Sequence, residues 1–270
     1  LDEDYGRDNE IPEEEFSILI REDIPARLAH FVSVQERPAA TLSAAQMSVG
    51  TARAIPDTML HAEISRLSPS IMFLEVETND GGKGSGTGFV ITPDGRLLTC
   101  AHVVRNARSV RARLLQPGMP GGDTRWFNCT VLSPVREDLD MAVLAIEGGS
   151  NFTPLSLRAP EETVSLTEPT LIIGYPFGTR LDRDTDRLQP THFEGRVCTM
   201  QHQGTTREYI GVDSSGKCGN SGSPVISRED GRVIGLFCGS VTEGDSLKEE
   251  INYFRPISLF WQHFVTGDNA

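Results

Sequence analysis

The sequence predicts an all-β protein, organised as a sandwich or barrel, with short helices and an N-terminal extension. From Ile71 to Ile257 the chain consists of short runs rich in β-branched and aromatic residues, separated by Gly, Pro, Asp and Asn. Such spacing is typical of many short antiparallel strands. No long amphipathic helix alternates with these runs, which disfavours a parallel α/β sheet. No internal repeat of fixed period is present.

The chain divides at about residue 56 into an acidic extension, residues 1–56, and a folded domain, residues 57–270. Residues 1–15 hold eight acidic side chains and are typical of a solvated tail. Residues 16–34 contain apolar clusters that could dock on the folded domain or on a partner protein.

A helix is expected where the extension joins the domain. Asp57 stands immediately before a helical pattern and is a candidate N-cap, because its carboxylate can accept from the free N–H groups of the first turn. An approximate apolar face is formed by Met59, Ala62, Ile64 and Leu67.

Composition excludes several classes of function. The formal net charge of −13 argues against nucleic acid as a partner, since phosphate binding needs a local surplus of Lys and Arg. No stretch approaches the roughly 18 apolar residues of a membrane span. The five cysteines are odd in number and widely spaced, so at least one is unpaired. Few disulfides favour a reducing compartment, and we therefore expect a cytoplasmic protein.

A serine in a glycine-flanked turn is the first candidate for chemistry. Ser221 lies between Gly219 and Gly222, just before the apolar pair Val225 and Ile226. A serine hydroxyl needs a base to become a nucleophile, and donors must already face the developing oxyanion. The N–H groups of Gly219 and Ser221 could form this oxyanion hole. The same hexapeptide is also compatible with an ordinary hairpin turn.

Two other motifs near this serine fail on inspection. Residues 211–218 nearly match a nucleotide-binding phosphate loop, but Cys218 stands where a hydroxyl should bind magnesium. The glycines and proline that follow would also break the helix that such a loop requires. The nucleophile elbow of α/β-hydrolases needs glycine two residues after the serine, and position 223 is Ser.

A histidine and an aspartate could serve this serine. His102 follows two β-type runs and sits where a strand ends, a position that holds a base rigidly beside a cleft. Asp140 directly precedes the apolar run Met141–Ile146, so its carboxylate should be partly buried and needs a partner. A histidine ring N–H is a suitable one. Asp138 could share the same strand face, and Asp140 is preferred for its contact with the apolar run.

Seven blocks in the right chain order resemble the trypsin-like serine peptidases, and among them the HtrA/Deg branch. They cover most of residues 57–262. Each is weak alone, but their order His, Asp, Ser makes coincidence improbable. The blocks are Ile64–Ser70, Gly84–Thr92, Leu98–His102, Asp140–Leu144, Ile173–Gly178, Gly219–Pro224 and Ile251–Ile257.

The resemblance implies two six-stranded antiparallel barrels, at about residues 66–160 and 161–262, with the active site between them. It implies acyl transfer through His102, Asp140 and Ser221 on a protein or peptide substrate, with no metal or organic cofactor. The chain departs from the branch at Cys218 and Cys238, in its extension, and in the expected absence of a PDZ module. A regulatory partner could bind residues 1–56. The competing hypothesis is a catalytically silent scaffold that keeps the barrels.

The same resemblance predicts the substrate pocket. Ser215 would form its base, and Ile251 would narrow it. The remaining wall would consist of Cys238, Gly239 and Ser240. A serine base carries no charge, so the pocket should favour medium or small uncharged side chains over Lys and Arg, unless Asp213, Glu249 or Glu250 reaches the pocket.

Overall fold

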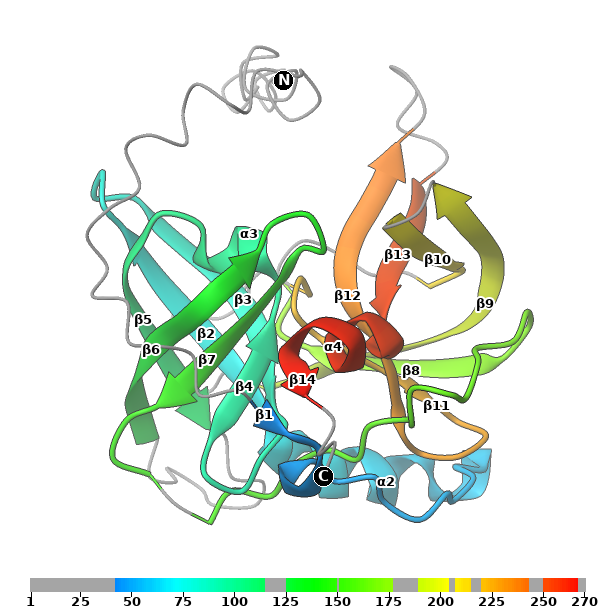
Figure 1. The fold of residues 1–270 in the computed structure, drawn as a ribbon. Helices are drawn as coiled ribbons and strands as arrows, with labels where there is room; N and C mark the ends of the chain where they lie inside the picture. Colours follow the sequence, from blue (N-terminus) through cyan, green and yellow to red (C-terminus); the bar gives the residue numbers. More distant parts are fainter. Residues whose placement is uncertain are drawn as a thin grey trace, which may run out of the picture. The chain divides into compact units, whose positions relative to one another are not determined.

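The computed structural model describes residues 42–114, 125–149, 151–176, 189–203, 207–214, 220–242 and 250–266. Strands dominate this part of the chain, and none of its helices is long and apolar enough to cross a membrane. The strands close into two six-stranded antiparallel barrels, which confirms the predicted fold (Figure 1).

The first barrel has the strand order β2-β3-β4-β7-β6-β5, and β5 closes it by pairing with β2. Closure leaves no strand edge open to another chain. Apolar side chains such as Leu74, Val110 and Leu144 fill its interior. Its elements are β2 (Ile71–Thr78), β3 (Lys83–Val90), β4 (Arg96–Thr99), β5 (Ala107–Leu114), β6 (Arg125–Arg136) and β7 (Met141–Ile146), with the short helix α3 (Ala101–Val104) between β4 and β5.

The second barrel has the order β10-β13-β12-β11-β8-β9, and β9 closes it by pairing with β10. Side chains such as Ile172, Ile234 and Phe254 fill its interior. Its elements are β8 (Pro169–Gly174), β9 (Thr191–Gln203), β10 (Arg207–Val212), β11 (Pro224–Ser227), β12 (Val233–Thr242) and β13 (Glu250–Pro256), followed by the helix α4 (Ile257–Phe264) and the short strand β14 (Val265–Thr266).

A third apolar cluster joins the barrels to one another. The ring of Phe73 from β2 meets the ring of Tyr175, which follows β8, edge to face at 5.8 Å between centroids. The Tyr175 hydroxyl also donates to the carbonyl of Ile71 at 3.3 Å. Because both aromatic side chains are fully buried, this contact restricts movement of one barrel against the other.

Residues 42–56, which the sequence analysis assigned to the extension, pack on the folded domain. The strand β1 (Leu42–Ser43) pairs in parallel with β14, and the Leu157 N–H donates to the carbonyl of Ser48 at 2.8 Å (Figure 1). The 3₁₀ turn η3 (Ala44–Gln46) follows β1. Ile55 is buried, and its N–H donates to the carbonyl of Arg228 at 2.7 Å. This part of the extension therefore docks on the domain itself.

The predicted helix is present, but Asp57 is not its N-cap. Asp57 begins the 3₁₀ turn η4 (Asp57–Met59), and its carboxylate pairs with Arg228. The helix α2 (Leu60–Leu67) comes next, and the 3₁₀ turn η5 (Ser68–Ser70) leads into β2. Because the 3₁₀ turn has fewer residues per turn than an α-helix, the apolar residues expected on one face do not all point the same way. Met59 and Ala62 are exposed, whereas Leu67 is buried.

Buried charges fix the segment that links the two barrels. The Arg158 guanidinium lies 2.5 Å from Glu168 and 2.7 Å from Asp230, with all three side chains largely buried. Burial raises the pKa of the Glu168 carboxyl, but the hydrogen bonds from Arg158, Ser227 and Ser165, together with the charge of Arg158, outweigh it, and the pKa is lowered. Removing Arg158 would leave the buried Glu168 carboxylate without its cation, so the group holds the linker in one position.

Candidate active site

His102 and Asp140 meet because their strands pair. His102 lies in α3, just after β4, and Asp140 directly precedes β7. Strand pairing places Thr99 opposite Ala142, which brings the two functional residues together across 38 positions of sequence. The His102 ring Nδ1 lies 2.8 Å from Oδ2 and 3.0 Å from Oδ1 of Asp140, and the His102 backbone N–H donates to Oδ1 at 3.0 Å. The carboxylate therefore orients both the ring and its backbone.

Asp140 is held in a conformation that few residues adopt. Its φ is +53°, in the left-handed region, at the end of a turn in which its N–H donates to the carbonyl of Glu137 at 3.2 Å. Burial raises the pKa of the Asp140 carboxyl, but hydrogen bonds and charge from His102 outweigh it and keep the pKa below its usual range. A carboxylate that stays ionised can hold the ring in one tautomer and stabilise an imidazolium.

The neighbouring Asp138 has a different role. Its exposed carboxylate lies 2.7 Å from Arg136, and the hydrogen bond from that guanidinium lowers its pKa. Of the two aspartates considered from the sequence, only Asp140 contacts the His102 ring. The sequence preference for Asp140 therefore agrees with the geometry.

Ser221 is held by a turn that contacts the first barrel. The backbone N–H of Thr87, in β3, donates to the Ser221 carbonyl at 2.9 Å, and the hydroxyl of Thr99 donates to the Thr87 carbonyl at 2.7 Å. On the other side, the Gly222 N–H donates to the carbonyl of Phe237 in β12 at 2.8 Å. Both barrels thus fix the backbone of the predicted nucleophile. Sequence reasoning missed Thr87, whose only signal was its place in the block Gly84–Thr92.

The Ser221 hydroxyl donates to the backbone carbonyl of Cys238 at 3.1 Å. Among the hydrogen bonds of the described residues, none joins this hydroxyl to the His102 ring. To donate to the His102 ring, the hydroxyl would have to leave the Cys238 carbonyl. Serine side chains rotate between staggered wells readily, and such contacts often tighten only when substrate is bound.

The predicted pocket residues are partly described. Ser215 and Gly219 lie outside the described residues. The side chain of Cys238 is buried among apolar residues, and its backbone carbonyl is the group that contacts Ser221. Gly239, with φ +154°, follows at an irregularity in the pairing of β12 with β13. Ser240 is exposed one residue later on β12.

On the other strand of this hairpin, Ile251 is half exposed and lies over Gly211 of β10. The buried Asn252 beside it donates to the carbonyl of Ser214 and holds the chain just before Ser215. Asp213 accepts from the backbone N–H of Arg196 at 3.0 Å, which directs its carboxylate toward β9.

Metal-ligating atoms also gather near the pair. Cys100, His102 and Asp140 each have one such atom within 4.8 Å of the other two. The ring nitrogen and the carboxylate are already hydrogen-bonded to each other, so a cation there would compete with this contact. Cys100 is a further residue that the sequence analysis did not single out, although it stands two positions before His102.

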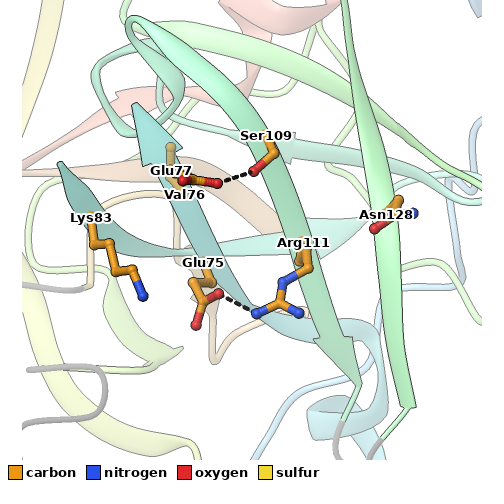
Figure 2. Close-up of a pocket in the computed structure, with 7 residues that line it drawn as sticks. All are labelled: Glu75, Val76, Glu77, Lys83, Ser109, Arg111 and Asn128. Atoms are coloured by element: carbon orange, nitrogen blue, oxygen red, sulfur yellow. Dashed lines mark hydrogen bonds and ion pairs between the residues drawn. The ribbon is translucent and has the colours of Figure 1, made fainter. Parts of the chain in front are cut away.

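A separate hollow lies on the outside of the first barrel, as Figure 2 shows, with a volume of about 340 Å³. Its walls are mainly polar, with Arg111 paired to Glu75 and the Ser109 hydroxyl donating to Glu77 at 3.4 Å. None of the predicted catalytic residues lines it. The lining residues are Glu75, Val76, Glu77, Lys83, Ser109, Arg111 and Asn128.

Comparison with known proteins agrees with this geometry. Residues 86–236 match the family model of the trypsin-like peptidase domain. The mitochondrial serine protease HTRA2 of Bos taurus is 32% identical over 196 residues, or 68% of this chain and 39% of the relative. Serine protease HTRA4 of Homo sapiens is 31% identical over 191 residues, or 68% of this chain and 36% of the relative. The chain thus spans less than two fifths of the length of these relatives.

Among solved structures, the HtrA-type protease AlgW with a tripeptide shares the fold. The two structures superpose with a TM-score of 0.60 and 20% sequence identity, over 75% of this chain and 61% of the other. Because the sequence identity is only 20%, this similarity supports a shared fold and nothing more specific.

The turn around Ser221 predicts a strict requirement for glycine at position 222. Gly222 has φ +89°, and an added Cβ would lie 1.9 Å from the Thr87 carbonyl oxygen. We expect Gly222→Ala to lower the free energy of unfolding by about 2 kcal/mol or more, since backbone strain and overlap combine. The control is Gly84→Ala on β3, where an added Cβ meets nothing within 4 Å. Equal effects of the two variants in denaturant titrations would contradict this account.

Proposed function

Because this chain belongs to the trypsin-like peptidase family, we propose that it is a serine endopeptidase that hydrolyses peptide bonds in proteins through Ser221, His102 and Asp140. The supporting observation is that Cys238 lies between both halves of the site. Its carbonyl accepts from the Ser221 hydroxyl, and its sulfur lies 3.7 Å from that of Cys100, which is within 4.8 Å of ligating atoms of His102 and Asp140. The nucleophile of one barrel thus lies beside the His102–Asp140 pair of the other.

The chemistry follows from these positions. Ser221 turns from the Cys238 carbonyl toward the free ring nitrogen of His102, which removes its proton as the oxygen attacks the substrate carbonyl. Asp140 stabilises the imidazolium that results. The backbone N–H groups of Gly219 and Ser221 receive the oxyanion, and His102 then protonates the leaving amine. Water activated by His102 hydrolyses the acyl-enzyme.

The resting hydrogen bond of Ser221 opposes this activity only weakly. A neutral intramolecular hydrogen bond contributes about 0.5–1.5 kcal/mol net, and about 1.4 kcal/mol corresponds to a tenfold change in rate. Breaking it therefore costs about one order of magnitude at most, against the 10⁶-fold or larger accelerations of enzymes. The geometry is compatible with an active enzyme at rest.

A second function is favoured by that same hydrogen bond. A catalytically silent scaffold would hold partners on the protease fold while its Ser221 hydroxyl stays bonded to the Cys238 carbonyl. A scaffold would keep its partner binding when Ser221 is replaced, and the wild-type chain would cleave nothing. The His102–Asp140 pair, with its ionised carboxylate, argues for the peptidase.

Partners and location belong to the same proposal. Protein or peptide chains are the substrates, and a regulatory protein is expected to bind residues 1–56. Since residues 42–56 already pack on the domain, the acidic residues 1–15 are the part we expect such a partner to contact. The cytoplasmic location inferred from the cysteines stays a prediction.

We predict that Ser221→Ala and His102→Ala each abolish cleavage of a denatured protein substrate without unfolding the chain. Loss of one member of such a triad typically leaves only about 10³–10⁴-fold catalysis over water. The matched control is His61→Ala, because His61 is exposed on α2. Near wild-type cleavage by Ser221→Ala would show that another residue is the nucleophile.

We predict a preference for Val, Leu, Ala or Thr immediately before the cleaved bond. Ser215 supplies no carboxylate, and a Lys or Arg side chain buried without a partner costs several kcal/mol. Asp213 is directed toward β9, so it does not offer the missing charge. Profiling of cleavage sites in a denatured protein mixture measures this preference. Ile251→Ala should extend it to larger apolar side chains, whereas a majority of cuts after Lys or Arg would disprove the assignment of Ser215.

A further inference from the structure

Two thiols from different barrels touch beside the candidate active site. Cys100 joins β4 to α3 in the first barrel, and Cys238 lies in β12 of the second. Their sulfur atoms are 3.7 Å apart, and both side chains are buried. The structure describes four free cysteines, including this pair. The contact crosses the boundary between the barrels and joins residues 138 positions apart.

Cys238 connects this thiol pair to the catalytic groups. Its carbonyl accepts from the Ser221 hydroxyl, and its sulfur touches that of Cys100, which lies within 4.8 Å of ligating atoms of His102 and Asp140. Cys100 in turn donates to the carbonyl of Phe237, the residue before Cys238, at 3.2 Å. A change in the bonding of either sulfur therefore alters groups that position Ser221 and Asp140.

We propose that Cys100 and Cys238 are an oxidation site at which a peroxide forms a disulfide bond between the two barrels. A disulfide needs an S–S distance of about 2.05 Å, so the sulfurs must approach by about 1.7 Å, a distance within reach of side-chain rotation and small strand shifts. Of the other described cysteines, Cys129 donates instead to the carbonyl of Phe127 at 3.9 Å, and Cys198 is exposed.

The reaction balances with hydrogen peroxide as oxidant. One sulfur, as thiolate, attacks a peroxide oxygen, which breaks the O–O bond and yields a sulfenic acid and water. The second thiol attacks that sulfur and displaces a second water. The two thiols together lose two protons and two electrons, and the peroxide is reduced to two waters. A small dithiol reverses the step by thiol–disulfide exchange.

The surroundings set the speed of this reaction. Burial raises the pKa of the Cys100 thiol, and its contact with Cys238 adds to the effect. Because the thiolate is the reactive form, oxidation of the pair should be slow at neutral pH and faster as the pH rises. The pair would therefore respond to sustained peroxide exposure, whereas the exposed Cys198 would react first.

The effect on catalysis rests on the proposed peptidase function. A disulfide draws the Cys100 and Cys238 sulfurs together beside the His102–Asp140 pair and shifts the strand whose carbonyl accepts from Ser221. Displacements of about 1 Å in an active site can cost about 100-fold in rate. Oxidation should therefore reduce cleavage, and the new link should raise resistance to unfolding.

The test treats the purified wild-type chain with hydrogen peroxide and maps its peptides by mass spectrometry without reduction. We expect a peptide that joins Cys100 to Cys238 and has lost two hydrogens, together with a fall in kcat/KM of about tenfold or more that dithiothreitol reverses. In Cys100→Ala, kcat/KM should be the same before and after peroxide. The control double variant Cys129→Ser/Cys198→Ser should still form the peptide that joins Cys100 to Cys238 and should still show the fall in kcat/KM.

Failures of the two proposals are distinguishable. Mapping that finds these two sulfurs as thiols or overoxidised acids, with no joined peptide, overturns the disulfide. A joined peptide with unchanged kcat/KM overturns its control of catalysis. If the reduced wild-type chain cleaves nothing, the peptidase proposal fails, while the peptide map still decides whether the barrels become linked.

Discussion

The hydrogen bond from the Thr87 N–H to the Ser221 carbonyl joins the two barrels at the point where chemistry is proposed. Thr87 is fully buried in β3 and is held by Thr99 on one side, while its hydroxyl accepts from the Tyr175 N–H at 3.0 Å on the other. The position of Ser221 relative to the first barrel therefore depends on backbone groups of β3. Gly222 is required because a Cβ there would overlap the Thr87 carbonyl and the Thr99 hydroxyl that binds it.

The second constraint is the partly buried charge of Asp140. A carboxylate removed from water needs compensation, and here His102 provides it through ring and backbone. Since the folded pKa of Asp140 is lowered, its charge stabilises the fold above the unfolded pKa of about 4 and loses this effect as the pH falls through the folded value. The same contacts that orient His102 thus contribute to stability at neutral pH.

The sequence predicted the parts that depend on local pattern. The run Ile71–Thr78 is a strand with the expected bounds. His102 lies just after the end of β4 and Asp140 just before the start of β7, the strand-end positions that the sequence predicted. The exposed and buried sides of the helix differ from the prediction because a 3₁₀ turn begins at Asp57, where an N-cap was expected. The ion pair between Asp57 and Arg228 is a tertiary contact that no local pattern contains.

The contacts between barrels could not be predicted in the same way. The turn of the Ser221 hydroxyl toward Cys238, the role of Thr87 and the Cys100–Cys238 contact all depend on how two closed sheets meet, which hydrophobic periodicity does not encode. Sequence could place each of these residues on a strand or turn. Only the packed structure brings them together.

The most direct measurement of the central claim is labelling of the resting wild-type chain with a fluorophosphonate, mapped by mass spectrometry. A serine activated by His102 attacks this reagent, so we expect one label per chain, on Ser221, and loss of labelling in His102→Ala. Absence of label on Ser221 with and without added peptide, or labelling that His102→Ala leaves unchanged, would contradict the account.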